Sequence, residues 1–264
     1  MIWTLYRMEL FKLVKRLASW VTYLSYGVLI VMLYGSFYYN ALKSKFAYFG
    51  FPNAWQAILE LSAPVVSTFS AVLIVQAVAS EFDWRTSRQN IIDGMSKRQW
   101  FTAKLLLLPT VAVFFFGSEL IYSGTLAWLG TDPEIENAFA ITSTQLHAII
   151  GVFIGVLCYS SIALLVSLSV RSTGPALGIT LIYQVFENIT TRTLRGFDLD
   201  RLADWFPFQV HLALLKYNQY LTAGAEAKRG LEHVWDTNLL FVAGFGWIAV
   251  FLTASWLVYR NRDL

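Results

Sequence analysis

Long apolar runs constrain this chain more than any other feature. Residues 17–42 contain no charged side chain. A helix rises about 1.5 Å per residue, so this run is long enough to cross a hydrocarbon core of about 30 Å. Further runs that are rich in apolar residues occur at 61–80, 105–130, 145–170, 174–191 and 237–259. The pattern predicts an all-α integral membrane protein in which residues 1–264 form a single domain with six transmembrane helices.

The composition agrees with a membrane protein rather than a soluble one. Of the 264 residues, 56% are hydrophobic and 14% are charged, whereas a soluble domain carries about 25% charged residues. Ten Trp, thirteen Tyr and twenty Phe would supply aromatic belts at two membrane interfaces. The net charge of +3 gives no indication of nucleic-acid binding, and with Cys158 as the one cysteine no disulfide forms within the chain.

The first sixteen residues have an amphipathic pattern. Apolar side chains recur every three or four residues at Trp3, Tyr6, Leu10 and Leu13, and Arg and Lys side chains lie mostly between them. Such a pattern is typical of a helix that lies on the membrane surface with its basic face toward anionic lipid headgroups. We therefore predict an interfacial helix over residues 1–16 on the cytoplasmic leaflet, before the first span.

A polar segment at 80–104 separates the second and third apolar runs. It holds five of the twenty Lys and Arg residues, and an excess of positive charge predicts the cytoplasmic face. A short helix is expected over 86–93, and it would stop at Gly94 because glycine adopts the left-handed cap at little cost. Ser96 and Gln99 have the spacing of a capping box that starts the next helix. A solvated loop that only obeys the positive-inside rule is the alternative.

The same segment resembles the first cytoplasmic loop of ABC-2-type transporter permeases. In that family an acidic residue lies at the end of the second span, and Gly-Thr and an apolar turn follow it. Pro-x-Ser-Arg comes next, before a Lys at the start of the third span. The matching residues here are Glu81, Thr86, Ile91, Ile92, Ser96, Lys97, Arg98 and Lys104. Arg85 stands where the family usually has Gly. Together with the layout of the spans, the resemblance covers nearly the whole chain.

The resemblance implies the membrane subunit of an ATP-driven exporter. In that family the loop is a coupling helix that docks on a separate P-loop ATPase, which would hold ATP and Mg. The corresponding docking residues are Glu81, Asp83, Arg85, Arg88, Asp93, Gly94, Ser96, Lys97 and Arg98. It also implies an elbow helix at the N-terminus, a second permease that is identical or related, and an inner (plasma) membrane location in contact with lipid. The chain itself would carry no catalytic residue, cofactor or metal, and both termini would be cytoplasmic.

Polar side chains in the second and fifth spans are the candidates for a substrate path. They are Ser67, Ser70, Gln76, Tyr183, Gln184, Glu187 and Asn188. Polar groups in a span face other helices or a cavity, so packing between helices is the alternative. In the fifth span, residues 172–186 cover only about 22 Å as a helix. Either the helix continues through Glu187, or it breaks there.

Two further features leave alternatives open. Glu119 interrupts the third span, and we expect it to be paired or exposed near the interface rather than to couple protons. The long connection 192–236 contains an aromatic segment at 204–208 followed by apolar residues to Leu221, which predicts a helix at the outer interface.

Two other functional classes remain as alternatives. The chain could be a non-transporting anchor or scaffold with a docking loop. An intramembrane enzyme is disfavoured, because His147 and Cys158 lie about three turns apart on one helix and no nucleotide-binding, hydrolase or metalloprotease motif is present.

Overall fold

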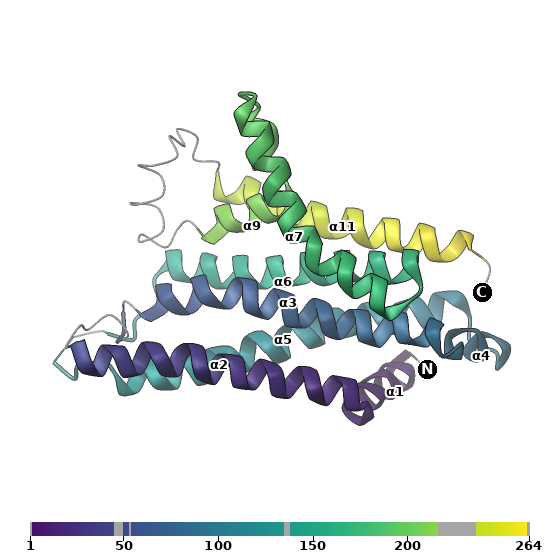
Figure 1. Ribbon diagram of the computed structural model, residues 1–264, viewed down its shortest axis with the longest axis horizontal. Helices are drawn as coiled ribbons and strands as arrows, with labels where there is room; N and C mark the ends of the chain where they lie inside the picture. The colour runs from purple at the N-terminus through teal and green to yellow at the C-terminus, as the bar shows by residue number, and fades with distance from the viewer. Residues whose placement is uncertain (1, 45–49, 53, 135–137, 216–235, 263–264) are drawn as a thin grey trace.

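Helices account for nearly all of the ordered structure in a computed structural model of the chain (Figure 1). The structure describes residues 2–44, 50–52, 54–134, 138–215 and 236–262, and these contain no strand. In chain order the helices are α1 (Ile2–Lys15), α2 (Leu17–Ser44), α3 (Ala54–Asp83), α4 (Thr86–Ile92), α5 (Lys97–Leu129), α6 (Ser143–Val170), α7 (Thr173–Gly196), α8 (Asp200–Asp204), α9 (Pro207–Leu215) and α11 (Thr237–Asn261). The all-α prediction is confirmed.

Within the described residues, five helices are long and apolar enough to cross a membrane, namely α2, α3, α5, α6 and α11. Their length and composition make the chain a multi-pass membrane protein. The predicted span at 174–191 forms the first part of α7, which is not among the five. Polar side chains such as Glu187, Asn188 and Arg192 interrupt its apolar run.

The centre of the bundle is the pair α3 and α6, which pack against each other more extensively than any other two helices. Small side chains line both helices, and these let two backbones approach closely in a membrane. Ser67, Ser70 and Ala71 are buried in α3, and Ser160 and Ala163 are buried in α6. Helices α2 and α5 pack beside α3, and α11 packs beside α6.

The other long helices lie roughly side by side along the bundle, and α7 departs from that arrangement (Figure 1). It begins against α3 and α6 and then rises steeply away from the bundle (Figure 1). The helix continues without a break through Glu187 to Gly196, which decides between the two alternatives for this segment.

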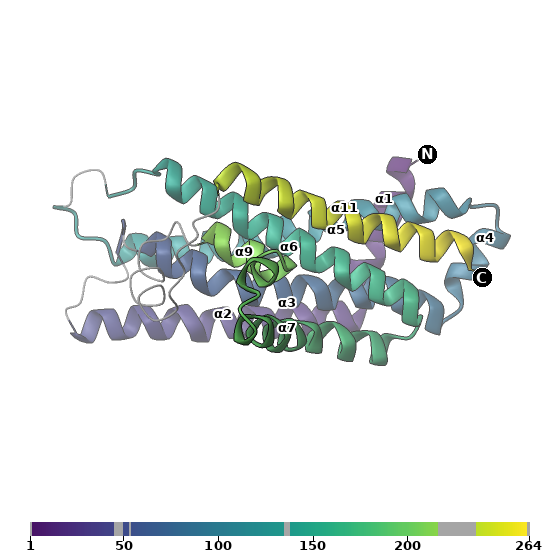
Figure 2. The same ribbon diagram turned by 90° about the horizontal axis from the view of Figure 1, so that it is seen from above.

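A helix is observed in the 192–236 connection as α9, which packs against both α6 and α11 (Figure 2). Pro207, Val210, His211, Leu214 and Leu215 are buried, so the helix lies within the packed bundle rather than only on its surface. The predicted extension to Leu221 lies outside the residues that the structure describes.

Candidate functional site

A short hairpin around α4 joins α3 to α5 at the end of the bundle where both chain termini lie (Figures 1 and 2). After α4, Gly94 has a φ of 99°, the left-handed conformation that glycine adopts at little cost. Ser96 Oγ accepts the Gln99 N–H at 3.2 Å, and Gln99 Oε1 accepts the Ser96 N–H at 2.9 Å. The stop at Gly94 and the capping box at Ser96 are thus confirmed.

The residue that precedes α4 is held in an uncommon conformation. Arg85 has a φ of 57° and a ψ of 15°, in the left-handed region. This conformation costs a residue with a side chain roughly 1–2 kcal/mol, and glycine avoids most of that cost. The turn into α4 therefore needs a backbone geometry that glycine would supply more easily than arginine.

One face of α4 holds the hairpin to the bundle and the other is open. Ser87 is buried and Ile91 packs against the core, whereas the side chains of Trp84 and Ile92 are 64% and 67% exposed. Asp83, Thr86, Gln89, Asp93, Gly94 and Ser96 are exposed too, and we give the name α4 surface to the exposed Trp, Ile and Arg residues, which are Trp84, Arg85, Arg88, Ile92 and Arg98. Aromatic residues and Arg are enriched where proteins bind other proteins. Four of these five residues are of those kinds.

Behind the hairpin lies a buried cluster of charges, the Glu81–Lys104 cluster, formed by Glu9, Lys12, Glu81, Trp100 and Lys104. Lys104 Nζ lies 2.8 Å from Glu81 Oε1 and also binds Glu9. Lys12 Nζ lies 2.9 Å from Glu81 Oε1 and 2.6 Å from Glu9 Oε1. Trp100 Nε1 donates to Glu81 Oε2 at 2.8 Å. Two carboxylates thus face two ammonium groups, and the Arg16 guanidinium lies 3.8 Å from Glu81 Oε1 as a third cation. These contacts join α1, α3 and α5.

The environment keeps the peripheral member of this cluster charged. Burial alone would lower the pKa of the Lys12 ammonium, but the neighbouring Glu81 and Glu9 carboxylates raise it above its usual value. Lys12 is therefore protonated at neutral pH and contributes a full positive charge.

These contacts correct one predicted docking residue. Glu81 has no exposed surface, and both of its oxygens accept hydrogen bonds inside the bundle. A carboxylate in that position cannot contact a partner at the surface. Its partners Glu9 and Lys104 are distant in sequence, so sequence analysis did not identify the cluster.

Two other predicted docking residues bind their own chain. Asp83 Oδ2 accepts the backbone N–H of Thr173 at 3.0 Å and the Thr173 hydroxyl at 2.5 Å. Lys97 Nζ donates to the carbonyls of Arg260 and Arg262 at 3.3 and 3.0 Å. The hairpin is therefore attached to the start of α7 and to the end of α11.

A third attachment leads from the hairpin to α1. The Arg16 guanidinium, just after α1, lies 5.3 Å from the centre of the Trp84 ring, a distance suited to cation–π attraction. Asp93, by contrast, accepts a hydrogen bond from Gln89 within the hairpin at 2.9 Å.

The predicted substrate-path residues of α3 fall into two environments. Ser67 and Ser70 are buried, and among the described residues their hydroxyls have no hydrogen-bond partner. Gln76 lies closer to the α4 end, where its Nε2 is 2.9 Å from Thr22 Oγ1 of α2 and its carbonyl accepts from Arg16. Gln76 therefore contacts α2 and Arg16 through its polar groups.

The family to which the sequence belongs can be stated from a comparison with family models. The model described as a protein of unknown function (DUF2705) matches residues 27–264. The chain belongs to the DUF2705 family. A search of curated proteins found no match. The matched part of this DUF2705 chain includes the hairpin, Glu81 and Lys104, while Glu9 and Lys12 of α1 precede it.

In the DUF2705 chain, the predicted polar group of α7 lies against α9. Glu187 Oε1 accepts the backbone N–H of Phe208 at 2.7 Å, so the carboxylate caps the start of α9. The ring of Tyr183 lies 6.0 Å from that of Phe208. Asn188 is exposed and donates to the Gln184 carbonyl at 3.0 Å. Glu187 and Tyr183 thus join α7 to α9, whereas Asn188 bonds within α7, and Gln76 is not part of this group.

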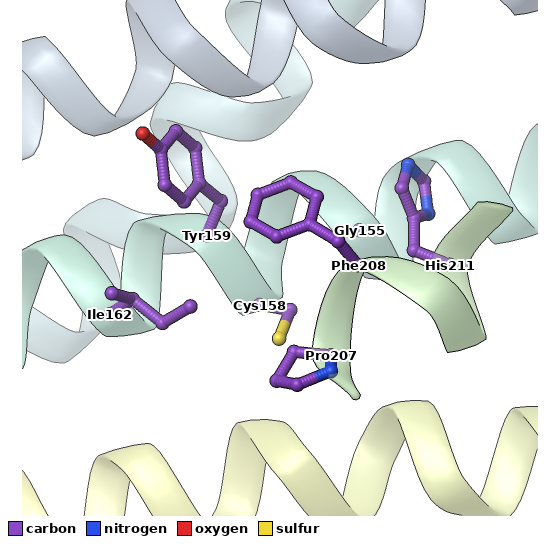
Figure 3. A pocket seen from close by; sticks show the side chains of 7 residues that line it. All are labelled: Gly155, Cys158, Tyr159, Ile162, Pro207, Phe208 and His211. Carbon is purple, nitrogen blue, oxygen red and sulfur yellow. The ribbon is translucent and has the colours of Figure 1, made fainter. Parts of the chain in front are cut away.

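A narrow, mostly apolar pocket lies next to this junction (Figure 3). It is lined by Gly155, Cys158, Tyr159, Ile162, Pro207, Phe208 and His211. The His211 ring lies directly on Gly155, where an added Cβ would be 2.0 Å from His211 Cε1. Among the described residues, no group of three or more His, Cys, Asp or Glu is placed to hold a metal ion. The pocket is the small space left where α9 packs closely against α6.

Glu119 of α5 is also placed in the interior. It has no exposed surface, and its Oε1 is hydrogen bonded to the Tyr34 hydroxyl of α2. This contact favours structural pairing over exposure at the interface.

Proposed function

We propose that this DUF2705 protein is the transmembrane permease subunit of an ATP-driven ABC exporter of the ABC-2 type. The observation that carries the proposal is the α4 surface, an outward-facing set of Trp, Ile and Arg side chains on and beside a short helix between two long apolar helices. Its counterpart in the resembling permeases is the coupling helix. The left-handed Arg85 gives further support, since the resembling family usually has Gly, the residue best suited to that conformation, at this position.

The proposal assigns a membrane arrangement to the helices. Helix α7 acts as a sixth span beside the five more apolar helices, and α1 is an elbow helix on the cytoplasmic leaflet. Both termini and α4 face the cytoplasm of a cell whose plasma (inner) membrane holds the protein. The Lys and Arg residues of the 80–104 segment support this orientation through the positive-inside rule.

The working unit would contain two permeases, identical or related, and two P-loop ATPase subunits. ATP and Mg bind the ATPase, and the permease has no catalytic role. Closure of the ATPase around ATP shifts the permease between two conformations, which requires the ATPase to bind those conformations with different affinity. Residues of α3 and α7, including Ser67, Ser70 and Tyr183, are candidates for the walls of the substrate path.

Copurification tests the proposal. The chain is isolated from its native membrane in mild detergent, partners are identified by mass spectrometry, and ATP hydrolysis is measured. We expect a P-loop ATPase in the sample. R88E/R98E should reduce the recovery of this ATPase at least about tenfold, because reversing two charges at the docking interface would place like charges against each other. The R192E/R201E variant is the matched control, since it makes the same change of charge at exposed positions in α7 and α8.

The possible results separate the candidate functions. An ATPase that is lost only with R88E/R98E supports the exporter subunit. Isolation of the chain without any ATPase in several detergents would contradict it and would favour a non-transporting anchor or scaffold.

A further inference from the structure

The first turn of α7 is capped by another helix. Ser172, the residue before α7, is extended and makes no side-chain cap to the helix. Thr173 instead donates its N–H and its hydroxyl to Asp83 Oδ2 of α3. A carboxylate at this place satisfies a free backbone donor and lies at the positive end of the helix dipole.

Asp83 lies between a fixed point and a turn. Two residues before it, Glu81 is held inside the bundle by Lys12 and Lys104. Two residues after it, the chain turns at Arg85 into α4. Only Trp84 separates Asp83 from that turn, so a force applied to α4 reaches Asp83 through a single residue.

A movement of the first turn of α7 would be passed on to the rest of that helix. Its start contacts α3 and α6, and its later part stands away from the bundle (Figure 1). Ile182 and Phe186 are 63% and 67% exposed, so much of this helix has no neighbour among the described residues. Glu187 then joins α7 to α9. Near its end, Arg195 also binds Asp204 at 3.1 Å and Gln209 at 3.0 Å. A shift at Thr173 would therefore move α7 together with α8 and α9.

We infer that Asp83 is the positioning residue that passes movement of α4 to α7 through its contact with Thr173. The inference rests on the proposed coupling function and replaces the earlier expectation that Asp83 contacts the ATPase. Asp83 touches neither ATP nor substrate, and it acts by holding the start of α7 to the end of α3.

The test follows α7 in the full complex with its ATPase, reconstituted in lipid nanodiscs. An environment-sensitive fluorophore is attached to I182C in a C158S background, and its emission is recorded with and without ATP and vanadate. A label at V250C, an exposed position on α11, reports on a helix that the contact does not reach. The amount of bound ATPase is measured in every sample.

We expect ATP to change the emission at position 182. D83A should reduce the fraction of molecules that show this change about fivefold, because it removes one helix cap. D83N should retain most of the change, because Asn also caps helices well. T173V removes only the bond from the Thr173 hydroxyl and keeps the one from its backbone N–H, so it should reduce the ATP-dependent change less than D83A does. It also serves as the test variant if D83A does not fold. D236A is the matched control, since Asp236 caps the start of α11; it should behave as the unaltered protein.

Each other result contradicts the inference in a different way. A full ATP-dependent change in D83A and T173V would overturn the Asp83 contact as the link and leave the exporter proposal standing. Loss of the ATPase from D83A would show that Asp83 docks the partner instead. The absence of any ATPase, or of any ATP-dependent change in the unaltered protein, would overturn the inference and the exporter proposal together.

Discussion

The Glu81–Lys104 cluster and the buried face of α7 differ in how their polar groups are paired. In the cluster, two carboxylates face two ammonium groups, and both Glu81 oxygens have partners. On α7, Glu187 Oε2, Gln184 Nε2 and Thr180 Oγ1 are buried without a hydrogen-bond partner among the described residues. The charge cluster is thus fully paired and this face of α7 is not, although Ser87 Oγ, Asn90 Nδ2 and the Tyr259 hydroxyl beside the cluster also lack a partner in the described part of the chain.

The difference indicates where the molecule is rigid. A buried polar network whose members are all satisfied favours a single arrangement, whereas each unsatisfied buried group costs about 1–3 kcal/mol. The helices joined by the charge cluster, α1, α3 and α5, should therefore behave as one unit. Helices α7 and α9 have more to gain from a rearrangement that brings their polar groups to new partners.

The largest expected effect comes from breaking the paired region. K104M removes the ammonium that both Glu81 and Glu9 bind, and it leaves two carboxylates with less compensation in the interior. Removing one partner of a buried pair costs about 3–5 kcal/mol. We expect that loss in the free energy of unfolding measured in detergent with a denaturant.

A second variant and a control complete this test. E81Q in the K104M background removes one of the two carboxylates that have lost Lys104, so the double variant should be more stable than the sum of the two single losses predicts. K97M changes a lysine on the same helix that binds only backbone carbonyls, and it should cost much less. Equal losses for K104M and K97M would contradict the contrast between the two regions.

An intermediate effect is expected where α9 meets α6. G155A would place a Cβ 2.0 Å from His211 Cε1, so α9 must move outward. Overpacking of this kind costs about 1–3 kcal/mol. Hydrogen exchange should show faster exchange of residues 207–215 and unchanged exchange of 97–108.

The control for this change is G178A in α7, where an added Cβ meets nothing within 4 Å. Alanine at an open helical position is neutral or stabilising by up to about 1 kcal/mol. Slower unfolding of G155A than of the unaltered protein would contradict the close approach of the two helices.

The smallest effect is expected at the start of α5. S96A removes the side-chain half of the capping box and should cost about 1 kcal/mol of unfolding free energy. S123A, on the same helix, removes a hydroxyl that bonds to a backbone carbonyl of its own helix, and it should change stability less. If S96A cost as much as K104M, the paired interior would not be the main source of stability at this end.

Local features of this fold could be predicted from sequence because neighbouring residues determine them. The uncharged run at 17–42 predicts α2 at its observed position. Gly94, Ser96 and Gln99 predict the end of one helix and the start of the next, because capping depends on residues within one turn.

The remaining features depend on residues that are distant in sequence. Lys104 meets Glu9 across 95 positions, so no local pattern indicates that Glu81 is buried rather than exposed. The contact of the His211 ring with Gly155 likewise depends on the packing of α9 against α6. A short polar pair on α1, Glu9 and Lys12 at a spacing of three, was the one available signal of a buried charge pair.

The charge cluster also sets an order of events during synthesis. Glu9 and Lys12 leave the ribosome long before Lys104, the residue that α1 needs in order to settle against α3 and α5. Until the chain has been made beyond that lysine, α1 cannot complete its contacts with α5. The N-terminal helix is therefore the first to be synthesised, but it reaches its final place only after α2, α3 and α4 have followed it.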